Sequence, residues 1–225
     1  MPLNNGFKIL ESNSPLSLSA CLLWLDFSDP NTVTLNGSDI SQINDKSGNN
    51  NHFVQGSAVN QPAYTDTLNG KNVATLTGTE FLTITGDIGL LAPFEIFAMV
   101  RINIGLGSNF ISDSLTSLDR VRFFQERNSN LFILSAGISQ QSISDAEGDY
   151  KLYNGLVDAT NAYIYINGVP GAPFNAGTNR MSPGIKLGGA LDGNIGEYIL
   201  INRRLISDER NILNTYMANK WGLSI

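Results

Sequence analysis

The stretch LDGNIGEYILINRRLISDERNILNTYMANKWGL (residues 191–223) decides the fold, because a strand pattern gives way to a helix pattern within it. GEYILINRRL (196–205) is a strand-like run. Ser207 is then placed as an N-cap, followed by two acids that suit the positive end of a helix dipole. Apolar side chains recur at helical spacing up to a C-cap glycine, Gly222, and they are Ile212, Leu213, Tyr216, Met217 and Trp221. The stretch predicts a strand followed by one short C-terminal helix.

Upstream of this stretch, strand-like runs alternate with turn signals. EIFAMVRINI (95–104) is nearly all apolar, which is typical of a central strand covered on both faces. Asn167-Gly168 and Asn69-Gly70 predict type I′ hairpin turns, because such turns need positive φ at both central positions. The other runs are LLWLDF (22–27), NVATL (72–76), FLTIT (81–85), RVRFFQE (120–126), LFILSAG (131–137), YIYINGV (163–169) and IKLGG (185–189). The chain is therefore expected to be all-β.

Composition limits the classes of partner. A chain of 225 residues with 42% hydrophobic residues suits one β domain, predicted at 18–225 behind a polar arm at 1–17. The net charge of −6 argues against a nucleic-acid partner. No apolar stretch is long enough for membrane insertion, and the N-terminus lacks the pattern of a secretory signal. Cys21 is the only cysteine and is expected to be a buried, inert thiol.

Three N-terminal segments resemble the opening of a laminin-G-like domain of the concanavalin A-like lectin/glucanase superfamily. They are LLWLDFSDPNTVTL (22–35), ISQINDKSGNNNHFVQ (40–55) and QPAYTDTLNGKNVATLTGTEFLTI (61–84). Residues 191–223 are similar to the final strand and helix of that family, which end in K-W-G, and YIYINGV resembles its hairpin. The resemblance implies a jelly-roll sandwich of two antiparallel sheets with a short C-terminal helix. It implies no single function.

The segment DKSGNNNHF (45–53) has two interpretations. Calcium takes six to eight oxygen ligands, and Asp45, Asn49 and Asn51 are candidates, with Asp192 and Glu197 as their only partners. The family tail often carries an acid where this chain has Gly196, so one ligand is missing. The alternative is a turn held by side-chain-to-backbone hydrogen bonds. His52, the only histidine, is then a loop residue bonded to the backbone rather than a catalytic one.

Glycan binding requires aromatic faces with amide, carboxylate or guanidinium groups beside them. Tyr163 and Tyr165 alternate with isoleucines, so one pair faces the core and the other faces out. Arg101 and Arg122 lie on candidate strands, and Tyr153, with Tyr150, flanks an expected loop. The candidate ligand-binding residues are therefore Tyr163, Tyr165, Arg101, Arg122 and Tyr153.

Catalysis is not expected. The glycosidases of the resembled superfamily place paired carboxylates on one strand as E-x-D-x-x-E or E-x-D-x-E, so that the two groups lie about 5 Å apart. This chain has no such motif, and its nearest approach, DAEGDY (145–150), contains Gly148 and is expected to form a loop.

The expected function is surface recognition by a non-enzymatic module with weak glycan binding or protein docking. Because no export signal is visible, the chain is interpreted as a phage virion protein, either a capsid decoration or fibre-associated. Its location is then the virion surface or the extracellular space, its partner is a glycan or a capsid or fibre protein, and it forms a homo-oligomer within a larger assembly. The alternatives are a structural capsid cement protein without a glycan ligand and a divergent glycoside hydrolase.

Overall fold

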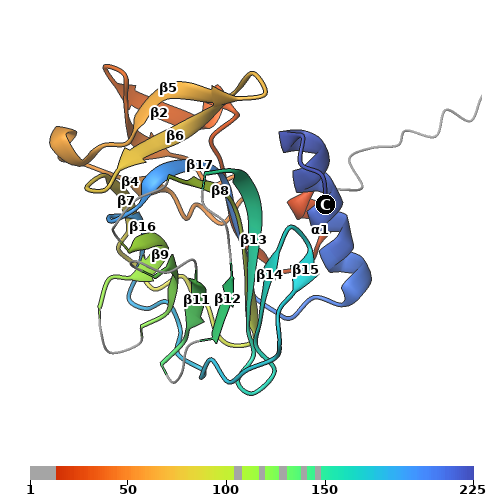
Figure 1. The fold of residues 1–225 in the computed structure, drawn as a ribbon. Helices are drawn as coiled ribbons and strands as arrows, with labels where there is room; N and C mark the ends of the chain where they lie inside the picture. Colours follow the sequence, from red (N-terminus) through yellow and green to blue (C-terminus); the bar gives the residue numbers. More distant parts are fainter. Residues whose placement is uncertain (1–13, 104–107, 117–119, 127–130, 138–140, 145–147) are drawn as a thin grey trace, which may run out of the picture.

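The computed structural model describes residues 14–103, 108–116, 120–126, 131–137, 141–144 and 148–225. These residues form 17 strands and one α-helix, α1 (Ser207–Trp221), and every described strand pairing is antiparallel. The chain folds as an all-β sandwich with the helix packed on one outer face (Figure 1).

The first sheet is built around β17 (Asp192–Ile201), the strand of the opening stretch. One edge of β17 pairs with β1 (Cys21–Asp26) and β6 (Lys71–Thr77), and the other edge pairs with β8 (Phe94–Ile102). From β8 the sheet continues through β13 (Tyr150–Val157), β14 (Tyr163–Ile166) and β15 (Val169–Pro170). Beyond β6 lies β5 (Ala63–Leu68).

The second sheet contains β4 (Phe53–Val54), β7 (Phe81–Ile84), β16 (Ile185–Gly188), β9 (Asn109–Ser114), β10 (Arg122–Gln125), β11 (Leu131–Ser135) and β12 (Gln141–Ser144). Two further strands, β2 (Val33–Asn36) and β3 (Asp39–Ile43), pair with each other. Because β3 pairs with both β4 and β5, it joins the two sheets at one edge. Short 3₁₀ turns lie at Pro15–Ser17, Pro30–Thr32 and Ala58–Asn60.

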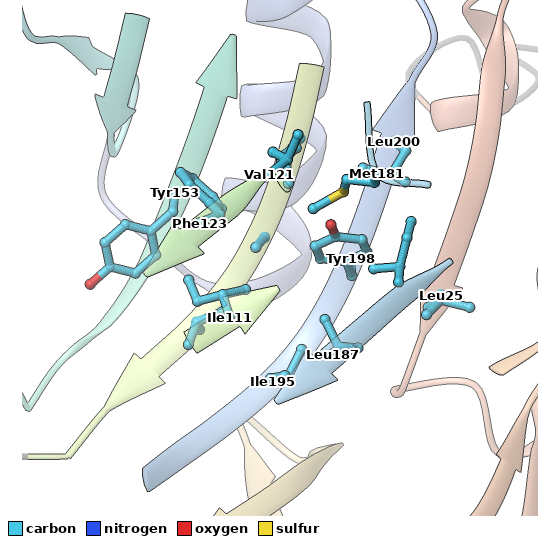
Figure 2. Close-up of a cluster of buried hydrophobic side chains, with 14 of the residues drawn as sticks. Leu25, Ile111, Val121, Phe123, Tyr153, Met181, Leu187, Ile195, Tyr198 and Leu200 are labelled. Atoms are coloured by element: carbon cyan, nitrogen blue, oxygen red, sulfur yellow. The ribbon is translucent and has the colours of Figure 1, made fainter. Parts of the chain in front are cut away.

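Strand β8 carries apolar side chains on both faces, which confirms the prediction of a central strand. Ile96, Ala98 and Val100 face the core between the sheets (Figure 2 shows part of this core). Phe97 and Met99 face the other way, into a second apolar cluster. That cluster lies beneath α1 and includes Trp24, Leu213, Met217 and Trp221. The helix therefore adds a third layer over the first sheet.

Turns and caps agree with the sequence, with two corrections. Asn167 and Gly168 have φ of 49° and 78°, and Asn69 and Gly70 have 49° and 72°, as type I′ turns require. Gly222 ends α1 at φ 72°. The N-cap, however, is Ile206 rather than Ser207, and its N–H is accepted by the Glu209 carboxylate. Tyr150 is the first residue of strand β13 and borders the bend at Gly148 and Asp149, as predicted, whereas Tyr153 lies inside the strand and flanks no loop.

Most of the predicted arm, residues 1–13, lies outside the described residues, as do residues 145–147 of DAEGDY. Within the described part, Pro15 is buried in the 3₁₀ turn Pro15–Ser17, and Leu18 belongs to the cluster beneath α1. Among the described helices, none has the length and apolar character required to cross a membrane.

Candidate functional site

A groove lies between the β14–β15 hairpin and the first half of α1, which are neighbours in Figure 1. We call it the hairpin–helix groove. Along β14, Ile164 is buried in the core, so the alternating tyrosines, Tyr163 and Tyr165, face outward and are half-buried. The sequence prediction that one pair faces the core and the other faces out is confirmed.

The groove consists of two adjoining hollows of about 320 and 310 Å³. The first contains the two tyrosines, Arg204 and Arg210. The second contains Asn167 at the hairpin turn and Ile225 at the end of the chain. Gly168, Asn211 and Asn214 line both hollows and therefore join them.

The tyrosine pair forms one continuous aromatic surface. The ring centroids of Tyr163 and Tyr165 lie 5.8 Å apart, with the ring planes at 36°. The guanidinium carbon of Arg210 lies 4.9 Å from the centroid of Tyr165. Burial raises the pKa of Tyr165, so its hydroxyl is protonated at neutral pH and can both donate and accept hydrogen bonds.

Both arginines of the groove are balanced by acids. Arg210 donates from Nε and Nη2 to the buried carboxylate of Glu95, at 3.0 and 2.7 Å. Glu95 also accepts the backbone N–H of Leu205 at 2.7 Å. Arg204 pairs with Asp158. The groove therefore presents little uncompensated positive charge.

Asn214 carries an unsatisfied acceptor at the junction of the two hollows. The residue is only 6% exposed, and its Oδ1 has no hydrogen-bond partner among the described residues. Leaving a buried acceptor unpaired costs about 1–3 kcal/mol. Gly168 lies beside the amide, since a Cβ there would be 3.4 Å from Asn214 Nδ2.

The sequence prediction missed the helix side of the groove. Its polar residues are Ser207, Arg210, Asn211 and Asn214, at spacings of i, i+3, i+4 and i+7. Residues at these spacings share one helix face, so a polar stripe beside the apolar one was visible in the sequence. What the sequence could not indicate is that this stripe lies beside β14.

The other predicted ligand residues do not reach the groove. Tyr153 is a correction, because it is 1% exposed and stacks on Phe132 in the core between the sheets (Figure 2). Arg122 lies on β10 of the second sheet, with its guanidinium 5.2 Å from the ring of Phe124. Arg101 lies on β8, beside Tyr150.

The segment DKSGNNNHF forms a hydrogen-bonded turn. The Asp45 carboxylate accepts the N–H groups of Trp24, Ser47 and Asn51 and the hydroxyl of Ser47, at 2.7–3.0 Å. The amides of Asn49 and Asn51 donate to the Leu22 carbonyl. His52 Nδ1 accepts the N–H of Asp45, which confirms that the histidine bonds to the backbone. This is the arrangement given from sequence as the alternative to calcium.

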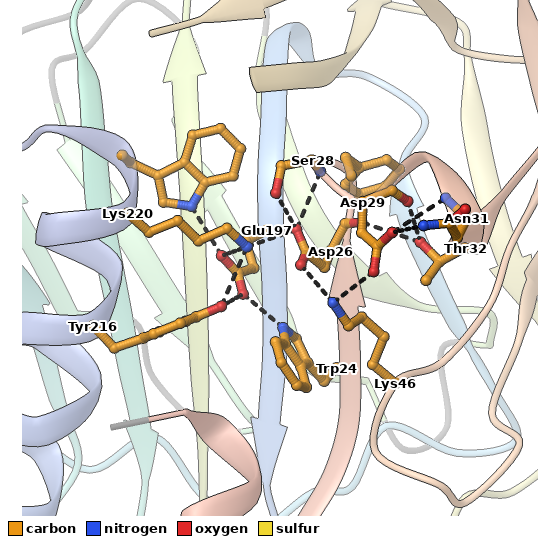
Figure 3. A network of polar contacts seen from close by, with 12 residues as sticks. Trp24, Asp26, Ser28, Asp29, Asn31, Thr32, Lys46, Glu197, Tyr216 and Lys220 are labelled. Atoms are coloured by element: carbon orange, nitrogen blue, oxygen red, sulfur yellow. Dashed lines mark hydrogen bonds and ion pairs between the residues drawn. The ribbon is translucent and has the colours of Figure 1, made fainter. Parts of the chain in front are cut away.

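The prediction that Glu197 is a calcium ligand is wrong. Its buried carboxylate accepts Trp24 Nε1 at 2.6 Å, Tyr216 Oη at 2.7 Å and Trp221 Nε1 at 2.9 Å, and it pairs with Lys220 at 2.8 Å (Figure 3). No oxygen is left for a metal. The carboxylate instead joins two of the segments on which the family resemblance rests, 22–35 and 191–223.

Asp192 is the second correction. It precedes Glu197 by five residues on β17, which places the two roughly 16 Å apart along the strand. Calcium ligands must all lie 2.3–2.6 Å from the ion, so these two acids cannot share one. The Asp192 carboxylate accepts the amide of Asn103 instead. Over the described ranges, no group of three or more His, Cys, Asp or Glu could hold a metal ion.

Cys21 is half-buried rather than fully buried. Burial, with a smaller contribution from Asp45, raises the pKa of its thiol to about 12. The thiolate is the reactive form, so this cysteine is poorly nucleophilic at neutral pH.

Comparison with known proteins shows the fold. No protein-family model matches this sequence, and none of the curated proteins matches it. Solved structures do match. Trypanosoma rangeli sialidase superposes with a TM-score of 0.62 at 12% identity over 92% of this chain, which spans only 34% of the sialidase chain. The binding domain of botulinum neurotoxin serotype D superposes with a TM-score of 0.65 at 13% identity. The match covers 92% of this chain and 54% of the neurotoxin chain.

Domain 4 of AbnA, an extracellular GH43 arabinanase from Geobacillus stearothermophilus, is similar over nearly its whole length. It gives a TM-score of 0.63 at 15% identity, covering 86% of this chain and 97% of the domain. All three are β-sandwich structures, consistent with a lectin/glucanase-like fold. At these identities the likeness establishes the fold.

Proposed function

We propose that this protein is a non-enzymatic glycan-binding module and that the hairpin–helix groove is its binding site. The observation that carries the proposal is the outward-facing pair Tyr163 and Tyr165, which lines the same hollow as the exposed polar side chains of Ser207 and Asn211. Binding sites of this kind combine an apolar surface with a few placed polar groups.

The chemistry of a sugar suits both parts of the groove. The C–H face of a pyranose or furanose ring packs on a tyrosine ring, which offers a flat surface and a polar hydroxyl. Sugar hydroxyls would exchange hydrogen bonds with the exposed side chains of Ser207 and Asn211, which can both donate and accept. Because Arg204 and Arg210 are already paired with acids, the groove favours an uncharged glycan over a sialylated or uronic one.

Some proteins with a similar fold bind glycans, which supports this proposal. The sialidase was solved with sialic acid, the arabinanase domain with arabinotriose, and cell entry by botulinum neurotoxin type C depends on two ganglioside molecules. Those ligands belong to those proteins, and a shared fold does not transfer them. The proposal of glycan binding therefore rests on the residues that line the hairpin–helix groove.

A direct test is screening on a glycan array followed by calorimetry with the best hit. We expect Tyr163→Ala and Tyr165→Ala each to weaken binding at least tenfold, while both variants still unfold in one cooperative transition. Arg122→Ala is the matched control, since it changes a partly exposed, predicted ligand residue on the other sheet and should have no effect. An affinity that survives the double tyrosine variant would place the site elsewhere.

The same protein should release no reducing sugar from the glycan it binds. Hydrolysis at a rate above background would replace this proposal with the divergent glycoside hydrolase. Attachment to a phage virion, as decoration, fibre-associated or cement protein, stays a prediction, as does assembly into a homo-oligomer.

A further inference from the structure

The two hollows of the hairpin–helix groove differ in the side chains that line them. The first hollow contains the tyrosine pair, which gives it a flat aromatic surface. The described residues that line the second hollow include no aromatic side chain, and its apolar surface comes from Val169 and Ile225. A branched aliphatic side chain presents methyl groups rather than a flat face, so it suits a compact apolar group better than the face of a sugar ring. The two hollows are therefore suited to different parts of a ligand.

Val169 and Ile225 are exposed to an extent that is uncommon for large apolar side chains. Their exposed fractions are 65% and 50%, whereas most large apolar side chains in the described part of the chain are buried. Single apolar residues scattered over a surface need no explanation, but an apolar surface inside a concave site indicates ligand binding. These two side chains share one hollow of about 310 Å³ and give it an apolar contact that faces solvent.

Polar side chains of α1 line the same hollow. Asn211 and Thr215 are both exposed, and because they are four positions apart they lie on one face of the helix. An asparagine amide and a threonine hydroxyl can each donate and accept hydrogen bonds. The second hollow therefore offers donors and acceptors beside its apolar contact.

The groove is longer than one sugar ring. Ser207 lines the first hollow and Thr215 the second, and they are separated by eight positions of α1, or roughly 12 Å along the helix axis. Gly168 and Asn211 line both hollows, so the two are continuous. A saccharide that fills the groove therefore has at least two residues.

The charge of the groove favours neutral groups in both hollows. No acidic side chain is found among the described residues that line them, and Arg204 and Arg210 are paired with Asp158 and Glu95. A charged ligand group would lose hydration here without gaining an unpaired opposite charge, which is unfavourable.

We propose that the second hollow binds the acetamido group of an N-acetylhexosamine residue, while a neighbouring residue of the same neutral oligosaccharide packs on the tyrosine pair. This inference rests on the proposed function and narrows it to N-acetylated glycans. The acetamido methyl packs against Val169 and Ile225, and its N–H and carbonyl bond to Asn211 and Thr215. A hydroxyl at that position of the sugar has no methyl group to fill the apolar contact, and a free amine is charged at neutral pH.

The experiment uses an array of neutral glycans in which each N-acetylhexosamine oligosaccharide is paired with the hexose oligosaccharide of the same linkage, as chitotriose is with cellotriose. Calorimetry then measures the best acetylated hit and its hexose partner. Val169→Thr and Ile225→Thr keep a branched side chain at an exposed position and replace a methyl contact by a hydroxyl, so both variants should fold. Val59→Thr is the matched control, because Val59 is 81% exposed and does not line the groove.

We expect the wild type to bind the acetylated member about tenfold more tightly than its hexose partner. The double variant Val169→Thr/Ile225→Thr should lose this preference and keep its affinity for the hexose member. Tyr163→Ala should weaken both members, and Val59→Thr neither.

Each other result contradicts a stated part of the argument. If both members of every pair bind equally and Tyr163→Ala weakens both, the acetamido inference is wrong and the groove proposal stands. A preference that persists in the double variant also overturns the inference, because the acetamido group then binds outside the second hollow. If Tyr163→Ala changes neither affinity, the groove proposal is wrong and the inference with it. An absence of any glycan binding overturns both.

Discussion

At the scale of single residues, Gly196 has a structural reason to lack a side chain. A Cβ at this position would lie 2.7 Å from the Trp221 ring, closer than van der Waals contact allows. The resembled family often carries an acid here, whereas this chain brings the indole of Trp221 onto the strand. The indole can then donate to Glu197, the next residue along β17.

Replacing Gly196 by alanine should therefore destabilise the fold. Forcing an extra methyl group into a well-packed site typically costs about 1–3 kcal/mol, because the neighbours must move. We expect a loss of that size in the free energy of unfolding, measured by urea denaturation. Gly56→Ala is the matched control, since a Cβ there meets nothing within 4 Å. Equal stability of the two variants would contradict the packing argument.

Asp45 gives a second prediction at this scale. Its carboxylate holds the Trp24, Ser47 and Asn51 N–H groups, so Asp45→Ala leaves buried donors unpaired and should cost about 2–3 kcal/mol. Because no metal is required, melting curves with chelator and with millimolar calcium should coincide for both wild type and variant. A calcium-dependent rise in melting temperature that disappears in the variant would restore the metal interpretation.

Asp45 also shows why the sequence could not decide between these interpretations. A turn and a calcium loop use the same short polar residues with a glycine, and they differ only in whether the oxygens meet N–H groups or an ion. Which of the two forms is decided by strand β1, more than twenty positions earlier in the chain. The backbone of β1 supplies the Trp24 N–H and the Leu22 carbonyl to which the turn bonds.

At the scale of elements, one polar network fixes α1 to the sheet. Lys220 of the helix lies between Glu197 on β17 and Asp26 on β1, and Lys46 continues the network to Asp29 (Figure 3). Burial tends to raise the pKa of Asp26, but the charge of Lys220 and hydrogen bonds from Lys220, Ser28 and Lys46 lower it overall. Burial raises the pKa of Glu197 despite Lys220.

These two acids should give opposite pH dependence. The folded-state pKa of Asp26 is depressed, so its contribution to stability is present above the unfolded value of about 3.9 and is lost as pH falls through the folded pKa. Glu197 has a raised pKa, so the folded state retains its proton longer, and stability decreases as pH rises from about 4.3 towards that pKa. Urea titrations of the wild type, Asp26→Asn and Glu197→Gln from pH 3 to 7 separate the two.

In a plot of the free energy of unfolding against pH, we expect Asp26→Asn to reduce the loss of stability that the wild type shows below pH 4. We expect Glu197→Gln to reduce the loss that the wild type shows as pH rises above 4. Asp158→Asn is the control, because Asp158 forms an ion pair outside this network. If both variants changed the pH dependence of stability in the same direction, the assignment of a lowered pKa to Asp26 and a raised pKa to Glu197 would be wrong.

Elements with regular patterns were predictable from sequence, and β13 shows where prediction failed. Asn154-Gly155 has the composition of a hairpin turn, yet both residues lie within the strand. The Asn154 amide donates to the Ile96 carbonyl and to Glu95. A Cβ at Gly155 would lie 3.0 Å from the Phe123 ring, so the glycine allows the second sheet to pack closely. Local composition could not reveal contacts that cross the sandwich.

At the scale of the whole molecule, the candidate site exists because distant segments meet. The hairpin at 163–170 and the helix at 207–221 are each readable from the sequence, and the tyrosine pair was predicted from alternation alone. The groove between them depends on α1 crossing the first sheet with its polar stripe towards β14. That orientation follows from Glu95, which binds Arg210 of the helix from the central strand β8.

The extent of the folded unit gives the last prediction, because the predicted boundary at residue 18 divides a packed segment. Pro15 is buried and Leu18, 7% exposed, contributes to the cluster beneath α1. Deleting residues 1–13 removes none of these contacts and should leave the urea unfolding midpoint unchanged. Deleting residues 1–18 removes the Leu18 side chain from the core, where losing a leucine costs about 2–5 kcal/mol. Leu16→Ala is the matched control within the segment, because Leu16 is 53% exposed. If the shorter deletion were as destabilising as the longer one, residues 1–13 would belong to the folded domain, and their assignment to an arm ahead of the domain would be wrong.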